Sequence, residues 1–560
     1  MTKKTTSKKV SPKKSPVKAT SDQKAVAAKV PATIKTMPLK HELLGSLKEA
    51  RLANPFEQLG LIKNPISDGF LLRAWLPDAT AVSFSALDDS GISGELLKVY
   101  EDGLFEINLP QVTDKFVYQL DAQYKSGSHQ FIDPYQFHEI AFDGLSTLHE
   151  APQNVYHTLG AQLKTVTVDG VEVSGVRFIV YAPNASSVSL ISAENHWDGQ
   201  RNPMQRSWCG HWVLFIPGLA AGCAYKFELK DGLGNRLPHK ADPVGFQAEL
   251  YPSHSSIVVD HDAYQWNDDA WRASQLGDKR YAAMSIYEVH LGSWKRKNEN
   301  GHERMLTYRE LASDLLPYLV EMGYTHLEVL PISEFPFDGS WGYQPVGLFA
   351  ATSRFGDADD LKYFIDQCHQ AGIGVIVDWV PAHFPSDPHG LARFDGTPLY
   401  EYEDPRRGWH PDWNSYIYDF GRDNVRQFLV ASALIWLDKF HVDGLRVDAV
   451  ASMLYWDYSR EEGEWVPNVD GGNHNYEAIS LLKWFNEEVY KQYPHAMTIA
   501  EESTAFSGVS KPTFDGGLGF GFKWNMGWMH DTLSYMQQDP MYRKYHHHEM
   551  TFAMVYHYNE

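Results

Sequence analysis

The stretch NVRQFLVASALIWLDKFHVDGLRVDAV, residues 424–450, contains two different hydrophobic patterns in direct succession. Over 424–440 the apolar residues recur at the spacing of an amphipathic helix. From Gly444 onward, the segment GLRVDAV is a short run rich in Leu and Val, which is typical of a strand buried on both faces of a parallel sheet. A helix followed at once by such a strand predicts one repeating unit of an α/β fold.

The same succession recurs between residues 283 and 528. Strand-like apolar runs lie at 283–294, 325–332, 372–383, 442–450, 496–503 and 517–528. Helical patterns lie at 308–323, 357–372, 424–440 and 476–493. Strands and helices that alternate at this spacing predict a (β/α)₈ TIM barrel over 276–560, of which we count strands one to six only. The active site of such a barrel lies at the carboxyl ends of its strands.

The residues before the barrel contain an internal repeat of strand and turn patterns. GFLLRAWLPDATAVSF begins at Gly69, and GVRFIVYAPNASSVSL begins at Gly175. In both copies an alternating strand enters an aromatic-x-Pro-(Asp/Asn)-Ala turn, and a second strand follows. A repeat of roughly 100 residues of strands and turns predicts two β-sandwich modules, at 43–150 and 151–275.

We expect each module to fold around its own core. The second copy contains Trp197, Trp208 and Trp212, and these tryptophans fit two interpretations equally well. In one interpretation they form a carbohydrate-binding surface, because aromatic rings stack on sugar rings. In the other they are core residues of a scaffold.

Composition narrows the class of protein and its partners. Residues 1–42 form a Lys-, Ser- and Pro-rich tail whose first 40 residues contain a single acid, Asp22, and we expect the tail to be disordered. The whole chain carries a formal net charge of -21, so a nucleic acid is not expected as a partner. Three scattered cysteines exclude a disulfide framework and a zinc site, which fits a cytoplasmic protein. No apolar run approaches the length of a membrane span, so no membrane partner is expected.

Charged side chains gather at the predicted carboxyl ends of the barrel strands. Asp378 and His383 close the third strand, Arg446 and Asp448 the fourth, and Glu501 the fifth. A structural network of ion pairs is one interpretation of this pattern. The other is a glycosidase-type site, in which two carboxylates act with different charges. Glu502 follows Glu501 directly, and only one of them can face the site because side chains of a strand alternate.

Several strings resemble the short motifs of the α-amylase superfamily. DWVPAH, GLRVDAV and AEES follow in the order of that superfamily's motifs. The longer strings GSWGYQPVGLFAATSRFG, FHVDGLRVDAVASMLY and MTIAEESTAF are closer to the 1,4-α-glucan (glycogen) branching enzymes. The resemblance runs from about residue 43 to residue 560 and includes both N-terminal modules.

The resemblance implies a role for each candidate residue. Asp448 would be the nucleophile, and Glu501 would be the general acid and base. Arg446 would hold Asp448 ionised by lowering the pKa of its carboxyl, whereas burial would raise the pKa of Glu501. Asp378, His383 and Tyr343 would bind the donor glucose, with the ring of Tyr343 as a stacking platform. No metal and no cofactor is expected.

The implied reaction is transfer of an α-1,4-glucan segment to a glucose 6-hydroxyl by a retaining double displacement, in a monomeric protein. Two alternatives stay open: an α-glucan hydrolase of the same superfamily (debranching or trehalose-releasing), and a non-catalytic glucan-binding protein. The family's fourth motif, a His-Asp pair on strand seven, has no match before Glu560. We therefore expect a C-terminally truncated chain, and residues 1–560 alone to be inactive.

Overall fold

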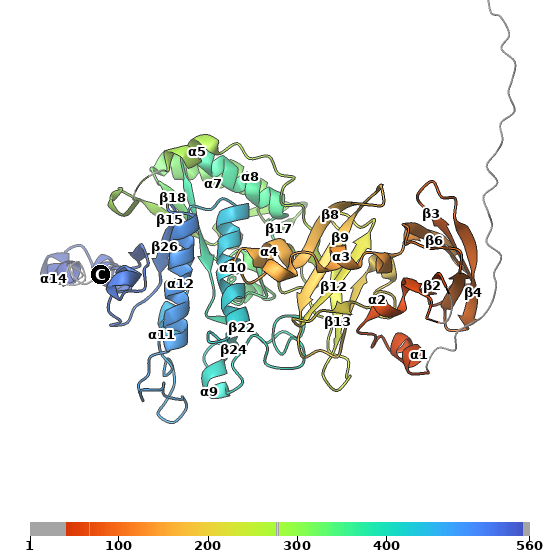
Figure 1. The fold of residues 1–560 in the computed structure, drawn as a ribbon. Coiled ribbons are helices and arrows are strands. Elements are labelled where there is room, and N and C mark those ends of the chain that lie inside the picture. Colours follow the sequence, from red (N-terminus) through yellow and green to blue (C-terminus); the bar gives the residue numbers. More distant parts are fainter. Residues whose placement is uncertain (1–40, 66–67, 276, 278, 553–560) are drawn as a thin grey trace, which may run out of the picture.

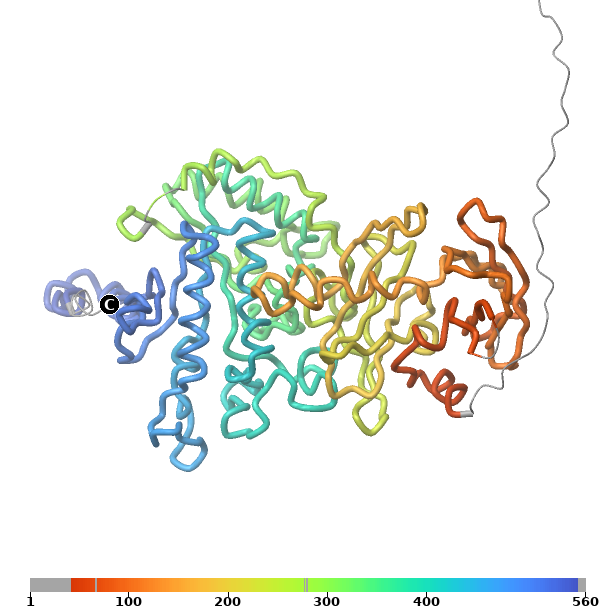
Figure 2. The backbone as a smooth tube through the Cα atoms, in the orientation of Figure 1, coloured from red at the N-terminus to blue at the C-terminus, as the bar shows by residue number. Residues whose placement is uncertain are grey.

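The computed structural model describes residues 41–552, with the exception of residues 66, 67, 276 and 278. Two groups of strands and then a helix-covered sheet follow one another along the molecule, and the last helices lie at the opposite end from the first strands (Figures 1 and 2). The predicted tail lies outside the described residues except for its last two, which open helix α1 (His41–Lys48).

The predicted barrel strands are confirmed as one six-stranded parallel sheet in the order β15-β18-β21-β25-β26-β27. The strands are β15 (Ile286–Val289), β18 (His326–Val329), β21 (Gly374–Trp379), β25 (Gly444–Val447), β26 (Met497–Ala500) and β27 (Phe522–Lys523). Their long helices are α7 (Tyr308–Met322), α8 (Ala358–Gln370), α10 (Asp423–Lys439) and α12 (Tyr476–Gln492). Among the described residues, β15 and β27 each pair with one neighbour, so the sheet is a barrel of six strands that does not close.

Local sequence signals explain where these helices begin and end. Helix α7 starts with a capping box, in which Thr307 and Glu310 satisfy each other's backbone N–H groups, and it ends at Gly323 with a left-handed φ of 76°. Helices α8 and α12 are preceded by the N-cap residues Asp357 and Asn475, whose side chains accept hydrogen bonds from backbone N–H groups of the first turn.

Shorter elements fill the connections of the barrel and its rim. The helices are α5 (Asp269–Ser274), α6 (Leu291–Trp294), α9 (Pro405–Gly408), α11 (Val450–Leu454), α13 (Met526–Gln537) and α14 (His547–Phe552). The strands are β16 (Arg296–Glu299), β17 (His302–Met305), β19 (Ser333–Glu334), β20 (Gly347–Ala351), β22 (His383–Pro385), β23 (Trp409–His410) and β24 (Ser415–Ile417).

The first N-terminal module is a curled antiparallel sheet in the order β1-β2-β5-β4-β3-β6-β7. Strand β4 pairs with β5 on one side and with β3 on the other, so it joins the two halves of the sandwich. The strands are β1 (Gly60–Lys63), β2 (Phe70–Trp75), β3 (Ala81–Ala86), β4 (Ser93–Tyr100), β5 (Leu104–Leu109), β6 (Tyr118–Tyr124) and β7 (Gly127–Ile132), and helix α2 (Pro55–Gln58) precedes them.

The second module is a sandwich of a three-stranded sheet, β10-β13-β14, and a four-stranded sheet, β11-β12-β9-β8. The strands are β8 (Gly160–Val168), β9 (Val171–Tyr181), β10 (Ser187–Ser192), β11 (Gln205–Arg206), β12 (His211–Pro217), β13 (Ala224–Lys230) and β14 (Ser256–Ile257). Helices α3 (His138–Phe142) and α4 (Asn154–Thr158) lie on the segment that connects the two modules.

The internal repeat is visible as a buried Tyr–Asp pair in each module. The hydroxyl of Tyr118 donates to Asp133 at 2.5 Å, and that of Tyr225 donates to Asp242 at 2.8 Å. Burial raises the pKa of both aspartates to about 6. In both copies the hydrogen bond therefore connects an Asp-Pro turn to the strand that contains the tyrosine, β6 in the first module and β13 in the second.

The three tryptophans of the second module have different environments. Trp212 is fully buried and its indole N–H donates to the carbonyl of Ala182, so it is a core residue. Trp197 is 36% exposed and Trp208 is 74% exposed. The scaffold interpretation therefore holds for Trp212 but not for Trp208.

The expectation of a separate core for each module is wrong for the second module. Its core residues, such as Val188 and Leu190, belong to the same continuous cluster as Leu434 of α10 and Val447 of β25. The first module has a core of its own around Leu72. Sequence patterns could not predict this, because an apolar residue buried within a module looks the same as one buried between modules.

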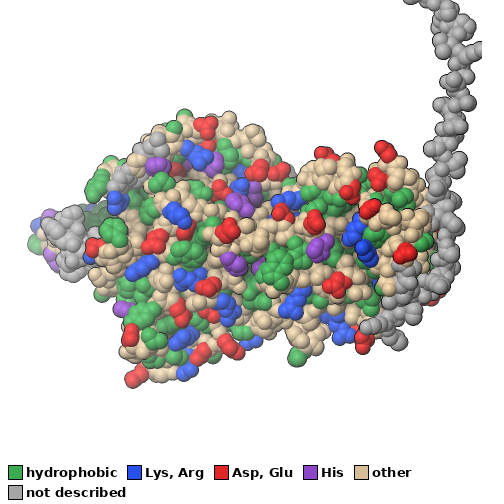
Figure 3. Space-filling model, viewed as in Figure 1, with side chains coloured by type: hydrophobic (Ala, Val, Ile, Leu, Met, Phe, Trp, Pro, Cys, Tyr) green, Lys and Arg blue, Asp and Glu red, His purple; other side chains and the backbone are tan. Residues whose placement is uncertain are grey.

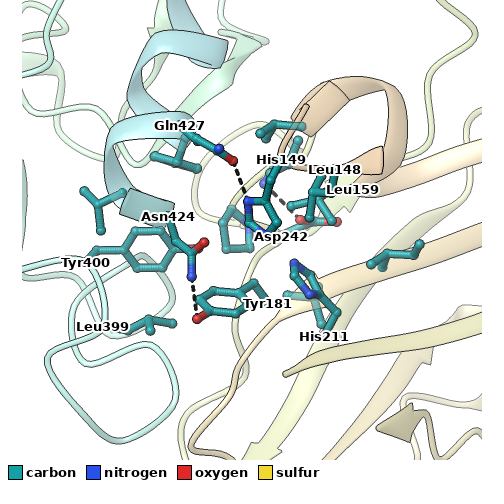
Figure 4. Close-up of a pocket in the computed structure, with 17 residues that line it drawn as sticks. Leu148, His149, Leu159, Tyr181, His211, Asp242, Leu399, Tyr400, Asn424 and Gln427 are labelled. Carbon is teal, nitrogen blue, oxygen red and sulfur yellow. Dashed lines mark hydrogen bonds between the residues drawn. The ribbon is translucent and has the colours of Figure 1, made fainter. Parts of the chain in front are cut away.

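Figure 4 shows where the second module meets helix α10. The side chain of Asn424 donates to the hydroxyl of Tyr181 at 2.6 Å, and the ring of His149 is 2.9 Å from the side-chain oxygen of Gln427. The cavity between them has a volume of about 40 Å³, whereas ligand pockets measure roughly 300–1,000 Å³. This contact is therefore a packed interface and not a ligand site. It also explains why α10 is buried on more sides than its amphipathic pattern predicts.

On the face shown in Figure 3, Lys and Arg side chains are interspersed with Asp and Glu rather than gathered in a basic band. Within the part of the chain that the structure describes, no helix is both long and apolar enough to cross a lipid bilayer.

Candidate active site

The parallel register of three neighbouring strands brings the candidate residues to one rim. Asp378 of β21 is the Cα partner of Arg446 in β25, and Arg446 is in turn the partner of Ile499 in β26. Asp448 is the first residue after β25, and Glu501 is the first residue after β26. The carboxyl ends of adjacent parallel strands share an edge, so these side chains converge.

Arg446 is the centre of the cluster. Its Nη1 is 2.9 Å from Oδ1 of Asp448 and 3.0 Å from Oδ1 of Asp378, and its Nη2 is 3.8 Å from Oε2 of Glu501. One guanidinium therefore contacts three carboxylates, and Arg446 itself is only 9% exposed. The charges inside the buried segment GLRVDAV are thus paired charges, which is the condition under which burial of a charge is tolerated.

The two predicted catalytic carboxylates differ in their environments. Asp448 makes the shorter contact with Arg446, and the side chain of Glu501 is more exposed, at 23% against 11%. Oε2 of Glu501 accepts a hydrogen bond of 2.7 Å from the backbone N–H of Ala449. Ala449 has a left-handed φ of 52°, which is uncommon for a residue with a Cβ and aims this N–H at Glu501.

Glu502 faces away from the cluster, as the alternation of a strand predicts. It is 1% exposed, its Oε1 accepts a hydrogen bond of 2.7 Å from the backbone N–H of Thr504, and its Oε2 forms an ion pair of 3.0 Å with Lys523. Of the two neighbouring glutamates, only Glu501 contacts Arg446.

Tyr343, Asp378 and His383 form a linked group beside Arg446. The hydroxyl of Tyr343 donates to Oδ2 of Asp378 at 2.7 Å, and Nε2 of His383 donates to the backbone carbonyl of Tyr343 at 2.7 Å. The guanidinium of Arg446 lies 5.9 Å from the centre of the Tyr343 ring. Asp378 is 1% exposed and has protein partners on both oxygens, so in this structure it orients Tyr343 and Arg446.

Burial governs the pKa values of the carboxyls at this rim. It raises the pKa of Asp448 above its ordinary range, although Arg446 acts in the expected direction and lowers this pKa. Burial also raises the pKa of Glu501, again against Arg446 and with help from the charge of Asp448. It raises the pKa of Asp378 to about 7.

The same burial keeps His383 neutral, because it lowers the pKa of the imidazole to about 4. A neutral ring that donates through Nε2 has an acceptor at Nδ1. Nδ1 is buried and has no hydrogen-bond partner among the described residues.

Comparison with known proteins assigns the family. Residues 40–135 match the family described as alpha-1,4-glucan branching enzyme GlgB, N-terminal domain, and residues 158–245 match carbohydrate-binding module 48 (isoamylase N-terminal domain). Residues 312–398 match the alpha amylase catalytic domain. The 1,4-alpha-glucan branching enzyme GlgB of Pseudoalteromonas atlantica is 61% identical over 520 residues, which are 93% of this chain and 71% of that protein. The chain belongs to the 1,4-α-glucan branching enzyme family.

Other relatives agree with this assignment. The branching enzyme GlgB of Vibrio cholerae is 59% identical over 92% of this chain and 69% of its own length. A crystal structure titled as a putative alpha amylase from Salmonella typhimurium aligns with a TM-score of 0.51 and 24% identity over 71% of this chain and 58% of that one, and it shows a shared fold.

Two aromatic residues of this branching-enzyme rim were not predicted from the sequence. Trp413 lies 4.8 Å from the His383 ring, and Tyr458 lies 5.9 Å from Trp413, measured between ring centres. The charges of Glu501 and Asp448 contribute to a raised pKa of Tyr458, after burial as the main cause. Both residues come from loops without a hydrophobic period, so no local signal pointed to them. No group of His, Cys, Asp or Glu that could hold a metal ion occurs among the residues with described positions.

Proposed function

We propose that this protein breaks α-1,4 links of a glucan and re-forms them as α-1,6 branches, with Asp448 as the nucleophile and Glu501 as the general acid and base. The observation that carries the proposal is the shared guanidinium of Arg446, which contacts Asp448 at 2.9 Å and Glu501 at 3.8 Å. A retaining double displacement needs one ionised and one protonated carboxyl on the same rim.

The environments of the two carboxyls favour this division of roles. Arg446 stabilises the anion of Asp448 through the shorter contact, whereas the longer contact leaves the raised pKa of Glu501 less opposed. In the first step an oxygen of Asp448 attacks the anomeric carbon, the C1–O4 bond breaks, and Glu501 gives its proton to the leaving oxygen. In the second step the 6-hydroxyl of an acceptor loses its proton to Glu501, attacks the same carbon and releases Asp448.

The neighbouring residues support binding of the donor glucose. The ring of Tyr343 offers a stacking face, His383 holds the backbone of Tyr343 through its Nε2, and Asp378 fixes the orientation of Tyr343 and Arg446. We further propose a monomeric cytoplasmic protein with domains at 43–150, 151–275 and 276–560, and α-1,4-glucan as its substrate.

Matched amide substitutions test the catalytic roles. Asp448→Asn and Glu501→Gln should each abolish the formation of α-1,6 links on amylose and keep the melting temperature. Glu502→Gln is the control, because Glu502 has the same side chain as its neighbour but pairs with Lys523. Azide should rescue Asp448→Ala but not Glu501→Gln, since only the former leaves space for an anion at the anomeric carbon.

Linkage analysis distinguishes the alternatives. A transferase forms α-1,6 links with little new reducing sugar, a hydrolase releases reducing sugar, and a binding protein does neither. The variants are made in the product of the full reading frame that contains residues 1–560. The same product without substitutions is assayed beside residues 1–560 alone, which we predict to be inactive. Wild-type branching by Asp448→Asn would refute the assignment of the nucleophile.

A further inference from the structure

Trp208 lies on the surface of the second module. It follows strand β11 in the turn to β12, on the edge of the four-stranded sheet, and it is 74% exposed. A single exposed apolar residue is normal on a protein surface. Trp208 differs because other rings and a hollow accompany it.

Three rings from two segments form a row, which we call the Trp208 platform: His138, Phe142 and Trp208. His138 and Phe142 are the first and last residues of α3, and their spacing of four places both rings on one face of the helix. Their ring centres are 4.6 Å apart. The ring of Trp208 lies 5.8 Å from that of Phe142 with an angle of only 9° between the ring planes, so the two rings are nearly parallel.

Polar groups surround the platform in a shallow hollow of about 580 Å³. The hollow is lined by the three rings together with Glu139, Asp143, Ser146, Arg206 and Ser207. Its volume is within the range of ligand sites, roughly 300–1,000 Å³, and contrasts with the cavity of about 40 Å³ at helix α10.

The polar rim contains both acceptors and donors for hydroxyl groups. Asp143 already contacts Arg177 at 3.1 Å and Lys164 at 3.5 Å, and Arg206 donates to the carbonyl of Pro183 at 2.8 Å. These contacts hold the rim side chains in place while the carboxylate oxygens retain further acceptor sites.

We propose that the Trp208 platform is a second binding site for α-1,4-glucan, separate from the catalytic rim, and this inference rests on the proposed function. A flat aromatic face with carboxylates and hydroxyls around it is complementary to a sugar ring, which has apolar faces and a hydroxyl edge. An anionic partner is disfavoured by the formal net charge of -21 of the chain. A stable protein interface would need a larger apolar area than three rings amid charged groups.

The site would be built by two parts of the chain that the family comparison separates. Trp208 and Arg206 lie within residues 158–245, which match the carbohydrate-binding module, whereas His138 and Phe142 lie on the connecting segment before it. A glucan held here would bridge the connecting helix and the second module.

Oxidative footprinting tests the site directly in the 560-residue chain. Hydroxyl radicals should oxidise Trp208 readily, and millimolar maltoheptaose should reduce that oxidation about fivefold or more. Phe514 is the internal control, because it is 93% exposed and lies outside the platform. Equal oxidation of Trp208 with and without maltoheptaose would overturn the proposal, as would equal protection of Phe514.

Affinity electrophoresis in glycogen-containing gels supplies the second measurement. In an Asp448→Asn background, Trp208→Ala should bind glycogen about fivefold or more weakly, whereas Trp208→Tyr and Phe514→Ala should bind within about twofold of the parent. Trp208→Ala that binds as the parent does would overturn the inference. Branching is measured on the product of the full reading frame without these substitutions, so loss of the platform and failure of the proposed catalytic function give different results.

Discussion

Replacement of Arg446 by Met should move the acidic limb of the pH–rate profile upward. Arg446 lies 2.9 Å from Asp448 and 3.0 Å from Asp378, and burial already raises the pKa of both carboxyls. At an effective dielectric constant of about 20 and a charge separation of about 4 Å, the lost attraction is about 4 kcal/mol, or about 3 pKa units. Screening by solvent and relaxation of the site reduce this value, so we expect the apparent pKa of the acidic limb of kcat/KM to rise by about 2 units.

The sign follows from the charge that the reaction needs. Without Arg446 the anion of Asp448 is less stable, so its pKa rises and a smaller fraction is ionised at each pH below the new pKa. The rate should therefore recover at alkaline pH instead of being lost at every pH. Arg446→Lys is the matched control, because it keeps a positive charge and should shift the limb by less.

The assay measures kcat/KM for α-1,6 link formation on amylose between pH 5 and pH 9. Circular dichroism at each pH checks folding, since removal of one partner of a buried ion pair costs about 3–5 kcal/mol of stability. An Arg446→Met profile with the wild-type acidic limb and a uniformly lower rate would refute the argument, because Arg446 would then not control the ionisation of the nucleophile.

Three further predictions concern donor-sugar binding, turnover and a buried histidine. Tyr343→Ala should weaken binding of the donor sugar by about 1–3 kcal/mol through loss of a stacking face, measured as KM for short maltosaccharides, and an unchanged KM with a lower melting temperature would count against the stacking role. His383→Ala should lower kcat more than it raises KM. His369 lies between Asp268 and Asp443, at 3.1 and 3.0 Å, and although burial disfavours its charge these carboxylates raise its pKa to about 9. The charged imidazole of His369 therefore stabilises the fold by about 3 kcal/mol below pH 6.5, and this stabilisation is lost as the pH rises through 9. The melting temperature of the wild type should fall over this pH range, whereas that of His369→Gln should not.

The elements that sequence predicted well are those whose signal is local. Apolar runs and helical periods predicted the six parallel strands and their helices, and the alternation of a strand predicted that Glu501 and Glu502 face opposite ways. The lowering effect of Arg446 on the pKa of Asp448 was predicted, but the larger opposing effect of burial was not, because burial depends on what the rest of the fold packs around this carboxyl. The contact between Tyr181 and Asn424, which are 243 residues apart, left no pattern in either segment.

The shared core predicts which parts of the molecule unfold together. Three leucines that are at most 1% exposed allow a matched comparison: Leu72 in the first module, Leu190 in the second and Leu434 in helix α10. Each Leu→Ala substitution should cost about 2–5 kcal/mol where its cluster is disrupted. Leu190 and Leu434 belong to one cluster, so both substitutions should lower the same calorimetric transition, whereas Leu72→Ala should lower a different one. If Leu190→Ala instead shifted a transition that Leu434→Ala leaves unchanged, the second module would unfold independently of the barrel. The packed contact of Asn424 with Tyr181 argues against that outcome, because loss of either side exposes apolar surface of the other.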